Sequence, residues 1–272
     1  MLKILKSNGT FFEPKFFTFN GGEEFVSIEG FEPESSVTIY AQITSSTWLI
    51  RLLMLHDALS KAGQNYVNLF IPYLPYARQD RVCHPGQSFS LEVFADLIKG
   101  KFIYIETCDV HSLVALKLIP NLINKPQHTA LPGVQSRLGH VDYIVAPDAG
   151  ATTKAKEWFD RWTRGETLTT QFIQASKKRN EKGEITETVI DGVDWLLPNS
   201  SCLIVDDICD GGRTFAELAK VLREKSASKV YLFVTHGILA NGIIGTGCDK
   251  VFTTDSLPEK DDGRIIVKRF LY

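Results

Sequence analysis

The sequence predicts an α/β fold with two tandem domains, each built on a mainly parallel sheet that helices flank. Short apolar runs alternate with helical patterns along most of the 272 residues, and such alternation is typical of parallel strands joined by helices. The alternation pauses at residues 121–140, where Pro126, Pro132 and Gly133 interrupt the pattern. A chain of this length commonly forms two cores. We therefore expect domains at 1–130 and 131–272.

The apolar runs predict the strands, and the segments between them predict the helices. In the first domain we expect strands within 37–43, 66–74 and 101–110 and helices within 46–63 and 90–100. The first helix carries apolar residues at helical spacing and ends at a glycine: Leu49, Leu52, Leu53, Leu59, Ala62 and Gly63. In the second domain we expect strands within 141–147, 171–176, 202–205, 229–239 and 250–258, and a helix from about residue 151.

Composition excludes several classes of protein. The net charge is −2 and no basic run is interleaved with aromatic residues, so we expect no nucleic-acid partner. The five cysteines contain no C-x-x-C pair, which argues against a zinc site and a disulfide framework. No apolar run approaches the roughly 20 residues of a membrane span, and the N-terminus lacks a leader pattern. We expect a cytoplasmic protein without a membrane partner.

Residues 203–217 predict a site for a sugar phosphate. Leu203–Val205 read as a buried strand that ends on Asp206 and Asp207. A loop of small residues follows, and its backbone amides at a helix N-terminus favour an anion such as phosphate. Carboxylates repel phosphate, so the two acids should accept hydrogen bonds from sugar hydroxyls or hold a metal ion. We expect the helix to begin with a capping box, with Thr214 as N-cap and Glu217 reaching back to it.

Three further polar clusters follow predicted strands, where open α/β sheets place their ligands. Residues 78–81 could bind a purine and its phosphates or form a surface ion-pair cluster; they are Arg78, Gln79, Asp80 and Arg81. Asp109 and His111 should point to one face of an extended backbone, where they suit a metal ion or a phosphate or serve structure alone. Asp148 precedes a predicted helix and is either a ligand or a helix cap.

A cationic segment lies between these clusters. Residues 177–182 include Lys177, Lys178, Arg179 and Lys182 and show no apolar period after Ser176. The segment reads as a mobile loop. Charge runs are usually only solvated, but a lid that supplies Lys and Arg to a developing phosphoryl charge is also known.

The order of these motifs resembles the ribose-phosphate diphosphokinase family, also called phosphoribosyl pyrophosphate synthetases. The family pattern is matched in order by FNGGE, YARQDR, DVH, PDAG, KKR, VDDICDGGRT and VTH, across almost the whole chain. The resemblance implies two tandem phosphoribosyltransferase-like domains, with ATP bound mainly by the first and the sugar phosphate by the second. It also implies Mg²⁺ as cofactor and a homo-oligomer, either a dimer or a hexamer.

The resemblance also implies roles for individual residues. The ATP contacts would be Arg78, Gln79, Asp80, Arg81 and His111, with Phe19 and Glu23 completing the adenine pocket of a neighbouring subunit. The metal would be held at Asp148, with Asp109 and His111 near it. The ribose hydroxyls would meet Asp206 and Asp207, and the 5-phosphate would meet Asp210, Gly211, Gly212, Arg213 and Thr214. The catalytic cations would be Lys177 and Arg179.

Departures from the family pattern leave the acceptor open. Gly21 replaces an Asp of the first motif, and residues 81–98 replace a more basic loop that carries regulatory phosphate sites. The phosphate loop reads DGGRT where the family has Asp-Thr-Gly-Gly-Thr, so Gly211 replaces a hydroxyl donor and Arg213 replaces a glycine. The first expectation is diphosphoryl transfer from ATP to ribose 5-phosphate, and the second is the same transfer to ADP-ribose. A phosphoribosyltransferase or a non-catalytic homologue ranks lower.

Overall fold

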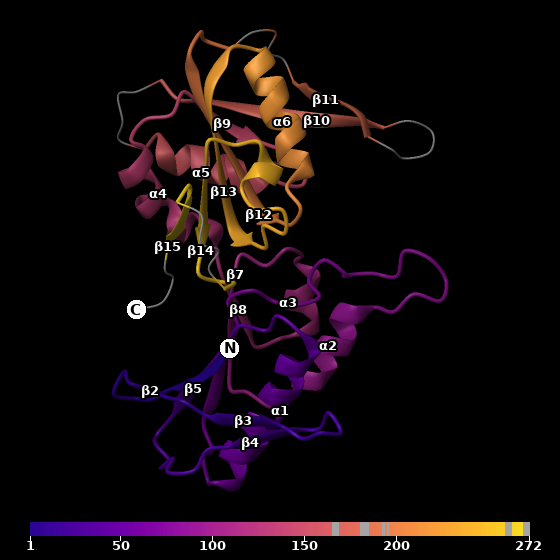
Figure 1. Ribbon diagram of the computed structural model, residues 1–272, viewed down its shortest axis with the longest axis vertical. Coiled ribbons are helices and arrows are strands. Elements are labelled where there is room, and N and C mark those ends of the chain that lie inside the picture. Colours follow the sequence, from indigo (N-terminus) through magenta and orange to yellow (C-terminus); the bar gives the residue numbers. More distant parts are fainter. Residues whose placement is uncertain (165–168, 180–184, 192–193, 195, 259–262, 269–272) are drawn as a thin grey trace. The chain divides into compact units, whose positions relative to one another are not determined.

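The chain forms two compact units, Met1–Lys125 and Pro126–Tyr272, each with its own core (Figure 1). The structure is a computed structural model that describes residues 1–164, 169–179, 185–191, 194, 196–258 and 263–268. The division falls at residue 125, inside the stretch where the alternation of apolar runs pauses and before residue 130.

The first unit has a mixed sheet whose parallel part carries the polar loops. The sheet order is β2-β1-β5-β6-β7-β8, with strands at Phe11–Phe12, Leu2–Leu5, Val37–Ala41, Val67–Phe70, Ile105–Cys108 and Leu122–Lys125. The pairs from β5 to β8 are parallel, whereas β1 runs antiparallel to both of its neighbours. A separate hairpin pairs β3 (Lys15–Thr18) with β4 (Glu24–Ser27). The helices are α1 (Ser46–Lys61), α2 (Ser90–Ile98) and α3 (Val114–Leu118).

The second unit is built on a mainly parallel sheet. Its order is β11-β10-β9-β12-β13-β14-β15, with strands at Ile185–Ile190, Gln171–Arg179, Tyr143–Ala146, Ser200–Cys209, Ala227–Gly237, Lys250–Thr254 and Ile265–Lys268. Only the β10–β11 pair is antiparallel among the pairings of its described strands. The helices are α4 (Leu131–Leu138), α5 (Thr152–Trp162) and α6 (Arg213–Glu224), with 3₁₀ turns η1 (Gln127–Ala130) and η2 (Ile244–Thr246).

Strand β12 is buried on both of its faces along residues 202–205, just before the two acids of the candidate site. Alternate residues of a strand point to opposite faces. Cys202 and Ile204 pack in the cluster that contains the apolar face of α6, whereas Leu203 and Val205 pack in the cluster that contains Trp158 of α5. Residues 202–205 therefore form a continuous apolar run, as in a central parallel strand, and Asp206 and Asp207 follow this run directly within β12.

Two of the differences between the predicted elements and the structure lie in α1 and in residues 121–140. Helix α1 buries Leu49, Leu52, Leu55 and Leu59, so Leu55 belongs to the core stripe and Ala62, which is exposed, does not. The stretch 121–140, predicted as an irregular boundary, contains β8 and α4. Pro132 is compatible with α4 because it lies in the first helical turn, where a missing N–H costs nothing.

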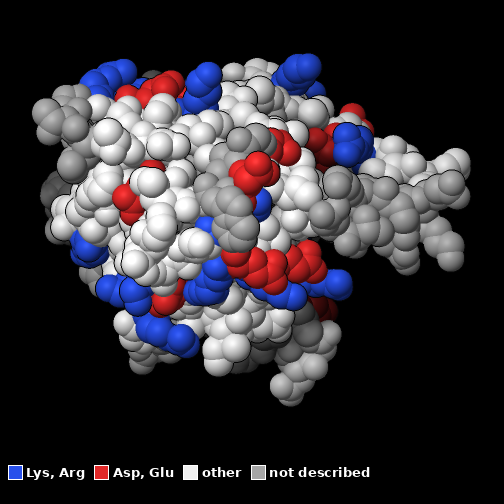
Figure 2. Space-filling model, turned by 90° about the horizontal axis from the view of Figure 1, so that it is seen from above, with Lys and Arg blue, Asp and Glu red and all other residues white. Residues whose placement is uncertain are grey.

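Lys and Arg side chains lie interspersed with Asp and Glu side chains over the face shown in Figure 2. No helix in the described part of the chain is long and apolar enough to cross a membrane.

Candidate functional site

Two adjacent acids, Asp206 and Asp207, lie within the last four residues of β12, which runs on to Cys209 rather than ending at the acids as predicted. Asp207 is buried, and its carboxylate forms a 3.1 Å ion pair with Lys154 of α5. The Asp207 N–H donates to Asp206 Oδ1 at 2.9 Å, and the Asp206 carbonyl accepts from Gln127 Nε2 at 2.5 Å. Both acids are thus held by groups from neighbouring elements of the same unit.

Negative charge is in excess around Asp206 and Asp207. Burial, together with the nearby charges of Asp207 and Asp148, raises the pKa of Asp206 to about 7, while the charge of Lys154 opposes this rise. Three carboxylates therefore interact around one lysine. A site with excess negative charge suits a cation or several hydroxyl donors. Lys154 was not predicted from the sequence; it lies one helical turn beyond Gly150, and only the packing of α5 on the sheet brings it to Asp207.

Asp148 stabilises the turn before α5 and also belongs to this acidic group. Its Oδ1 accepts hydrogen bonds from the N–H groups of Gly150 at 3.0 Å and Ala151 at 3.2 Å, just before α5 begins. The N-cap of α5 is Ala151 and no side chain caps the helix, so the interpretation of Asp148 as the helix cap is wrong, and its hydrogen bonds stabilise the turn that precedes α5. These hydrogen bonds do not exclude a ligand role, since each carboxylate oxygen has more than one lone pair.

The loop between β12 and α6, residues 210–214, is here called the phosphate loop. Helix α6 begins at Arg213, with Gly212 at the N-cap in a left-handed conformation (φ 85°), and no side chain caps it. The predicted capping box is therefore wrong. Two glycines let the chain enter the helix earlier than a Thr214 cap would, and Glu217 pairs with Arg213 at 2.9 Å instead. Without a side-chain cap, the first helical N–H groups remain available to an anion.

Arg213 lies in the open. Its side chain is 91% exposed, and its ion pair with Glu217 is correspondingly weak. A ligand phosphate could replace that pair at little cost.

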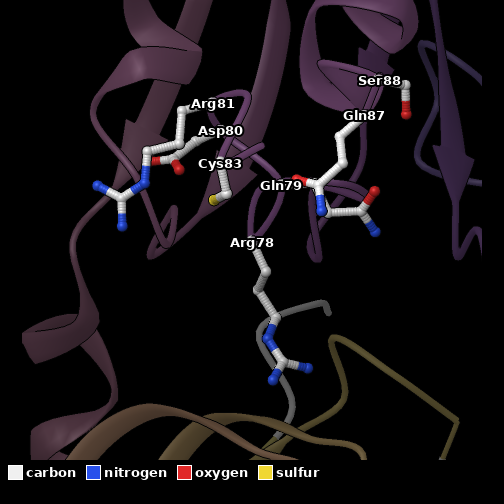
Figure 3. A pocket seen from close by; sticks show the side chains of 7 residues that line it. All are labelled: Arg78, Gln79, Asp80, Arg81, Cys83, Gln87 and Ser88. Carbon is white, nitrogen blue, oxygen red and sulfur yellow. The ribbon is translucent and has the colours of Figure 1, made fainter. Parts of the chain in front are cut away.

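In the first unit, four of the seven residues predicted to contact ATP line a pocket of about 510 Å³, whereas His111, Phe19 and Glu23 are not among its lining residues. Figure 3 shows the lining side chains, which are Arg78, Gln79, Asp80, Arg81, Cys83, Gln87 and Ser88. Asp80 accepts a 2.7 Å hydrogen bond from Ser112, which follows β7 and so ties two strand-end loops together. Sequence reasoning missed Cys83, Gln87 and Ser88, although they lie in a polar stretch without apolar period directly after Arg81.

Asp109 and His111 do not form the predicted side-by-side pair. Strand β7 ends at Cys108, and Asp109 takes a left-handed backbone conformation (φ 42°), so the extended geometry that the prediction assumed is absent. Asp109 is buried, with its N–H bound to the Lys125 carbonyl at 2.8 Å, whereas His111 is exposed. His111 is thus the one of the two that a ligand can reach.

Phe19 and Glu23 lie at the turn of the β3–β4 hairpin. The Phe19 N–H donates to the Glu23 carbonyl at 2.8 Å, which closes the turn. Phe19 is 50% exposed and packs edge-on against Phe17 and Phe25, which are also exposed. A Cβ at Gly21 would lie 2.8 Å from Glu23 Oε2, so glycine leaves room for that carboxylate.

The cationic segment begins on a strand rather than in a loop. Lys177, Lys178 and Arg179 belong to β10, which pairs antiparallel with β11, and the register shifts between Lys178 and Arg179. The prediction of a loop from residue 177 is wrong, because backbone pairing in a hairpin does not need an apolar period. Figure 1 shows this hairpin extending from the second unit. Lys182 lies outside the described residues.

Comparison with known proteins assigns the family. Residues 6–101 match the N-terminal domain of ribose phosphate pyrophosphokinase, and residues 134–245 match the phosphoribosyl transferase domain. A ribose-phosphate pyrophosphokinase of Pyrococcus abyssi is 29% identical, covering 88% of this chain and 82% of that protein. One from Cereibacter sphaeroides is 32% identical, covering 71% and 56%.

A solved structure agrees with the architecture. The crystal structure of phosphoribosylpyrophosphate synthetase from Mycobacterium smegmatis aligns with a TM-score of 0.80, covering 94% of this chain and 86% of that one at 22% identity. At 22% identity, this structural similarity supports the fold alone. With both sequence domains matched in order and the two-unit fold shared, the chain belongs to the ribose-phosphate pyrophosphokinase family.

Proposed function

We propose that this protein transfers the β,γ-diphosphate of ATP to the anomeric hydroxyl of ribose 5-phosphate. The hydroxyl oxygen bonds to the β-phosphorus, the bond from that phosphorus to the α,β-bridging oxygen breaks, and AMP leaves. The hydroxyl proton passes to solvent. The products are AMP and phosphoribosyl pyrophosphate.

One observation supports this reaction most directly. The buried apolar run of β12 leads into two acids near the end of the strand, and the strand is followed by a glycine loop and a helix without a side-chain cap. Acids suit ribose hydroxyls and an uncapped helix start suits a phosphate dianion, so one sugar phosphate satisfies both. The second unit would bind the sugar phosphate at Asp206, Asp207 and the phosphate loop. The first unit would bind ATP in the pocket around Arg78.

The test follows both phosphorus-containing products. The purified protein is incubated with ATP, Mg²⁺ and ribose 5-phosphate, and phosphorus NMR should show AMP and a sugar 1-diphosphate in equal amounts. ADP as the sole nucleotide product would contradict diphosphoryl transfer. A reaction that consumes the 1-diphosphate with a nucleobase instead would identify a phosphoribosyltransferase.

Magnesium fits the acidic group of the second unit. Mg²⁺ keeps several waters and binds through one or two carboxylates together with substrate phosphates. No three His, Cys, Asp or Glu side chains converge as a complete metal cage within the described residues, which is compatible with such partial coordination. Asp148 is the proposed protein ligand in the second unit, and His111 is the exposed candidate in the first. A bound Mg²⁺ would neutralise phosphate charge during transfer.

The remaining catalytic charge is assigned to Lys177 and Arg179. Diphosphoryl transfer needs positioning and charge neutralisation more than covalent chemistry. Both residues lie near the outer end of β10, and a preorganised hairpin that delivers two cations meets that need. No general base is assigned.

The acceptor has a second candidate, which Arg213 favours. Its exposed guanidinium stands at the first position of α6, next to the phosphate loop. It could fork onto the second phosphate of a longer acceptor, and ADP-ribose is such a molecule. Ribose 5-phosphate remains the first candidate, with Arg213 left in solvent beside Glu217.

Arg213→Gly separates the two acceptors. If the acceptor is ADP-ribose, kcat/KM of the variant should fall roughly ten- to a hundredfold for ADP-ribose, because a charge-assisted contact contributes about 1.5–3 kcal/mol. The value for ribose 5-phosphate should change little. Parallel kinetics with both sugars measure this. Inert ADP-ribose excludes the longer acceptor, and an equal effect on both sugars excludes the bridging role of Arg213.

A homo-oligomer, at least a dimer, is the proposed functional form. The exposed cluster of Phe17, Phe19 and Phe25 at the β3–β4 hairpin would be covered by, or would cover, the adenine site of a neighbouring copy. Phe19→Ala should raise the KM for ATP several-fold. An active monomer in light scattering, at the protein concentration of the assay, would contradict this arrangement.

A further inference from the structure

Asn241 binds the phosphate loop from the segment 239–247, here called the support segment, which follows β13. Three donors of this segment bind three successive carbonyls: the Leu239 N–H binds Cys209 at 3.0 Å, the Ala240 N–H binds Asp210 at 3.0 Å, and Asn241 Nδ2 binds Gly211 at 2.9 Å. The first two come from backbone N–H groups that lie just past the last pair of β12 and β13, Cys209 with Gly237. The third comes from a side chain because the backbone turns away at Gly242, which has φ 60°.

These bonds determine where the loop amides point. In a planar trans peptide the C=O and the following N–H point in opposite directions, and the described chain contains no cis peptide. Carbonyls 209, 210 and 211 are directed at the support segment, so the N–H groups of Asp210, Gly211 and Gly212 are directed away from it. Successive amides with one direction form a nest for an anion, here at the start of α6.

The peptide between Gly211 and Gly212 is the one whose orientation most needs a stabilising contact. It joins two glycines, so no side chain resists its rotation, and a flip would replace the Gly212 N–H by the Gly211 carbonyl oxygen, which repels phosphate. The Asn241 amide favours the observed orientation. Close packing favours it too, since a Cβ on Gly245 would lie 2.7 Å from both the Gly211 carbonyl oxygen and the Cβ of Asn241.

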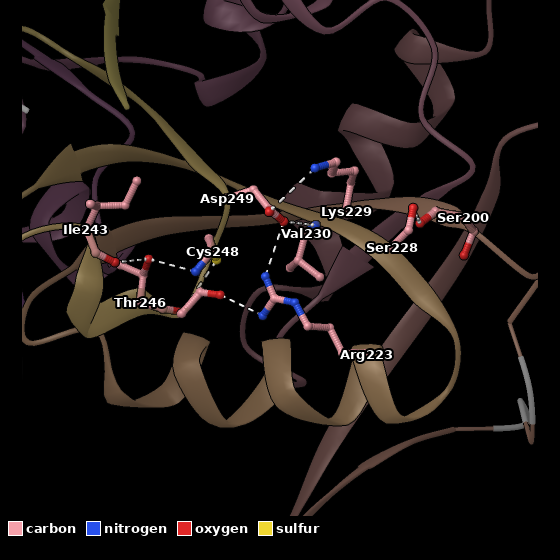
Figure 4. A network of polar contacts seen from close by, with 10 residues as sticks. Ser200, Arg223, Ser228, Lys229, Val230, Ile243, Thr246, Cys248 and Asp249 are labelled. Atoms are coloured by element: carbon pink, nitrogen blue, oxygen red, sulfur yellow. Dashed lines mark hydrogen bonds and ion pairs between the residues drawn. The ribbon is translucent and has the colours of Figure 1, made fainter. Parts of the chain in front are cut away.

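The support segment is itself anchored at its far end, as Figure 4 shows. Arg223 of α6 donates to the Gly247 carbonyl at 2.7 Å and to Asp249 at 3.2 Å. Thr246 Oγ1 donates to the Ile243 carbonyl at 2.6 Å and accepts from the Cys248 N–H at 3.2 Å. The exposed Asn241 side chain is therefore presented from a turn with little freedom to move.

We propose that Asn241 is a positioning residue that holds the Gly211–Gly212 peptide with its N–H toward the sugar phosphate. The inference rests on the proposed function of the loop. It also gives Gly211 a role. A Cβ at Gly211 would lie 3.3 Å from Asn241 Nδ2, so a larger residue, such as the threonine of the family pattern, would crowd the side-chain amide of Asn241. Gly211 and Asn241 act as a matched pair.

The first test is Asn241→Ala. Loss of one hydrogen bond should raise the Kd for ribose 5-phosphate, or for ADP-ribose if that is the acceptor, roughly three- to tenfold. The KM for that sugar should rise equally, while kcat and the KM for ATP stay within about twofold. Asn241→Asp should bind more weakly still, because a carboxylate cannot donate and repels the phosphate. Ile244→Ala is the control, since Ile244 lies in the same segment and is 82% exposed.

The second test is a double-mutant cycle measured by calorimetric titration. Gly211→Ala and Asn241→Gly should each weaken sugar-phosphate binding, and the double variant should be no weaker than the weaker single one, because both act on one peptide. Strictly additive effects, an unchanged Kd for Asn241→Ala, or an equal rise in the KM for ATP would overturn the proposal. If the parent binds the sugar phosphate without forming AMP, only the proposed reaction fails. If the parent binds neither sugar, both fail.

Discussion

Replacing Arg179 by alanine should lower kcat about a hundredfold or more while leaving the KM for ATP nearly unchanged. Removing one preorganised charge that acts on the transition state typically costs this much. An effect confined to kcat follows because the developing charge on the transferred diphosphate exists only in the transition state. Lys177→Ala should behave in the same way. Steady-state kinetics with ATP and the sugar varied separately measure both parameters.

Lys178→Ala is the matched control for these two variants. It removes the same charge as Lys177→Ala from the same strand, yet the resemblance assigns it no role, so its kcat should stay within about threefold of the parent. A raised KM with unchanged kcat in the Arg179 variant would show that the hairpin only binds substrate. A loss in Lys178→Ala as large as in the other two would show that the hairpin's total charge matters rather than individual residues.

Much of the fold was predictable because its signals are local. The apolar runs of β5, β6, β9, β12 and β13 are buried strands of parallel sheets, and these give continuous apolar stretches. The hairpin of β10 and β11 was not predicted, since its pairing satisfies backbone groups of polar residues without burying them. Helix α4 was also missed, because a proline in the first helical turn was interpreted as a helix breaker.

The candidate site was predictable where the chemistry lies in one short stretch, and less so where distant residues meet. Asp206 and Asp207 and the glycines of the phosphate loop adjoin one another in sequence. Lys154 and Asn241 reach these residues only through the packing of α5 and the support segment. Asp109 was misjudged because a single residue with positive φ ends the alternation of side chains at β7.

Asp206→Asn should sharply lower activity and yet stabilise the protein at pH 8 in the absence of Mg²⁺. As an acceptor of sugar hydroxyls, a charged carboxylate contributes about 1.5–3 kcal/mol per hydrogen bond, so kcat/KM for the sugar phosphate should fall on the order of a hundredfold. Burial and the charges of Asp207 and Asp148 raise the pKa of Asp206 from 3.8 to about 7. The ionised Asp206 carboxylate therefore destabilises the folded state, and a neutral asparagine removes this destabilisation.

The pH dependence of this stabilisation has a definite sign. A carboxyl whose pKa is higher in the folded state binds its proton more tightly there, so its contribution is fully present below about pH 4 and is lost as pH rises through about 7. The gain in melting temperature of Asp206→Asn over the parent should thus be small at pH 5 and larger at pH 8. Asp160→Asn is the control, because Asp160 is exposed on α5 of the same unit. An equal shift in melting temperature at both pH values would contradict a raised pKa of Asp206. If Asp206→Asn kept the kcat/KM of the parent, contact of Asp206 with the sugar would be contradicted. The reason is that a neutral amide cannot replace a carboxylate that is needed both by the sugar hydroxyls and by the charge balance of the site.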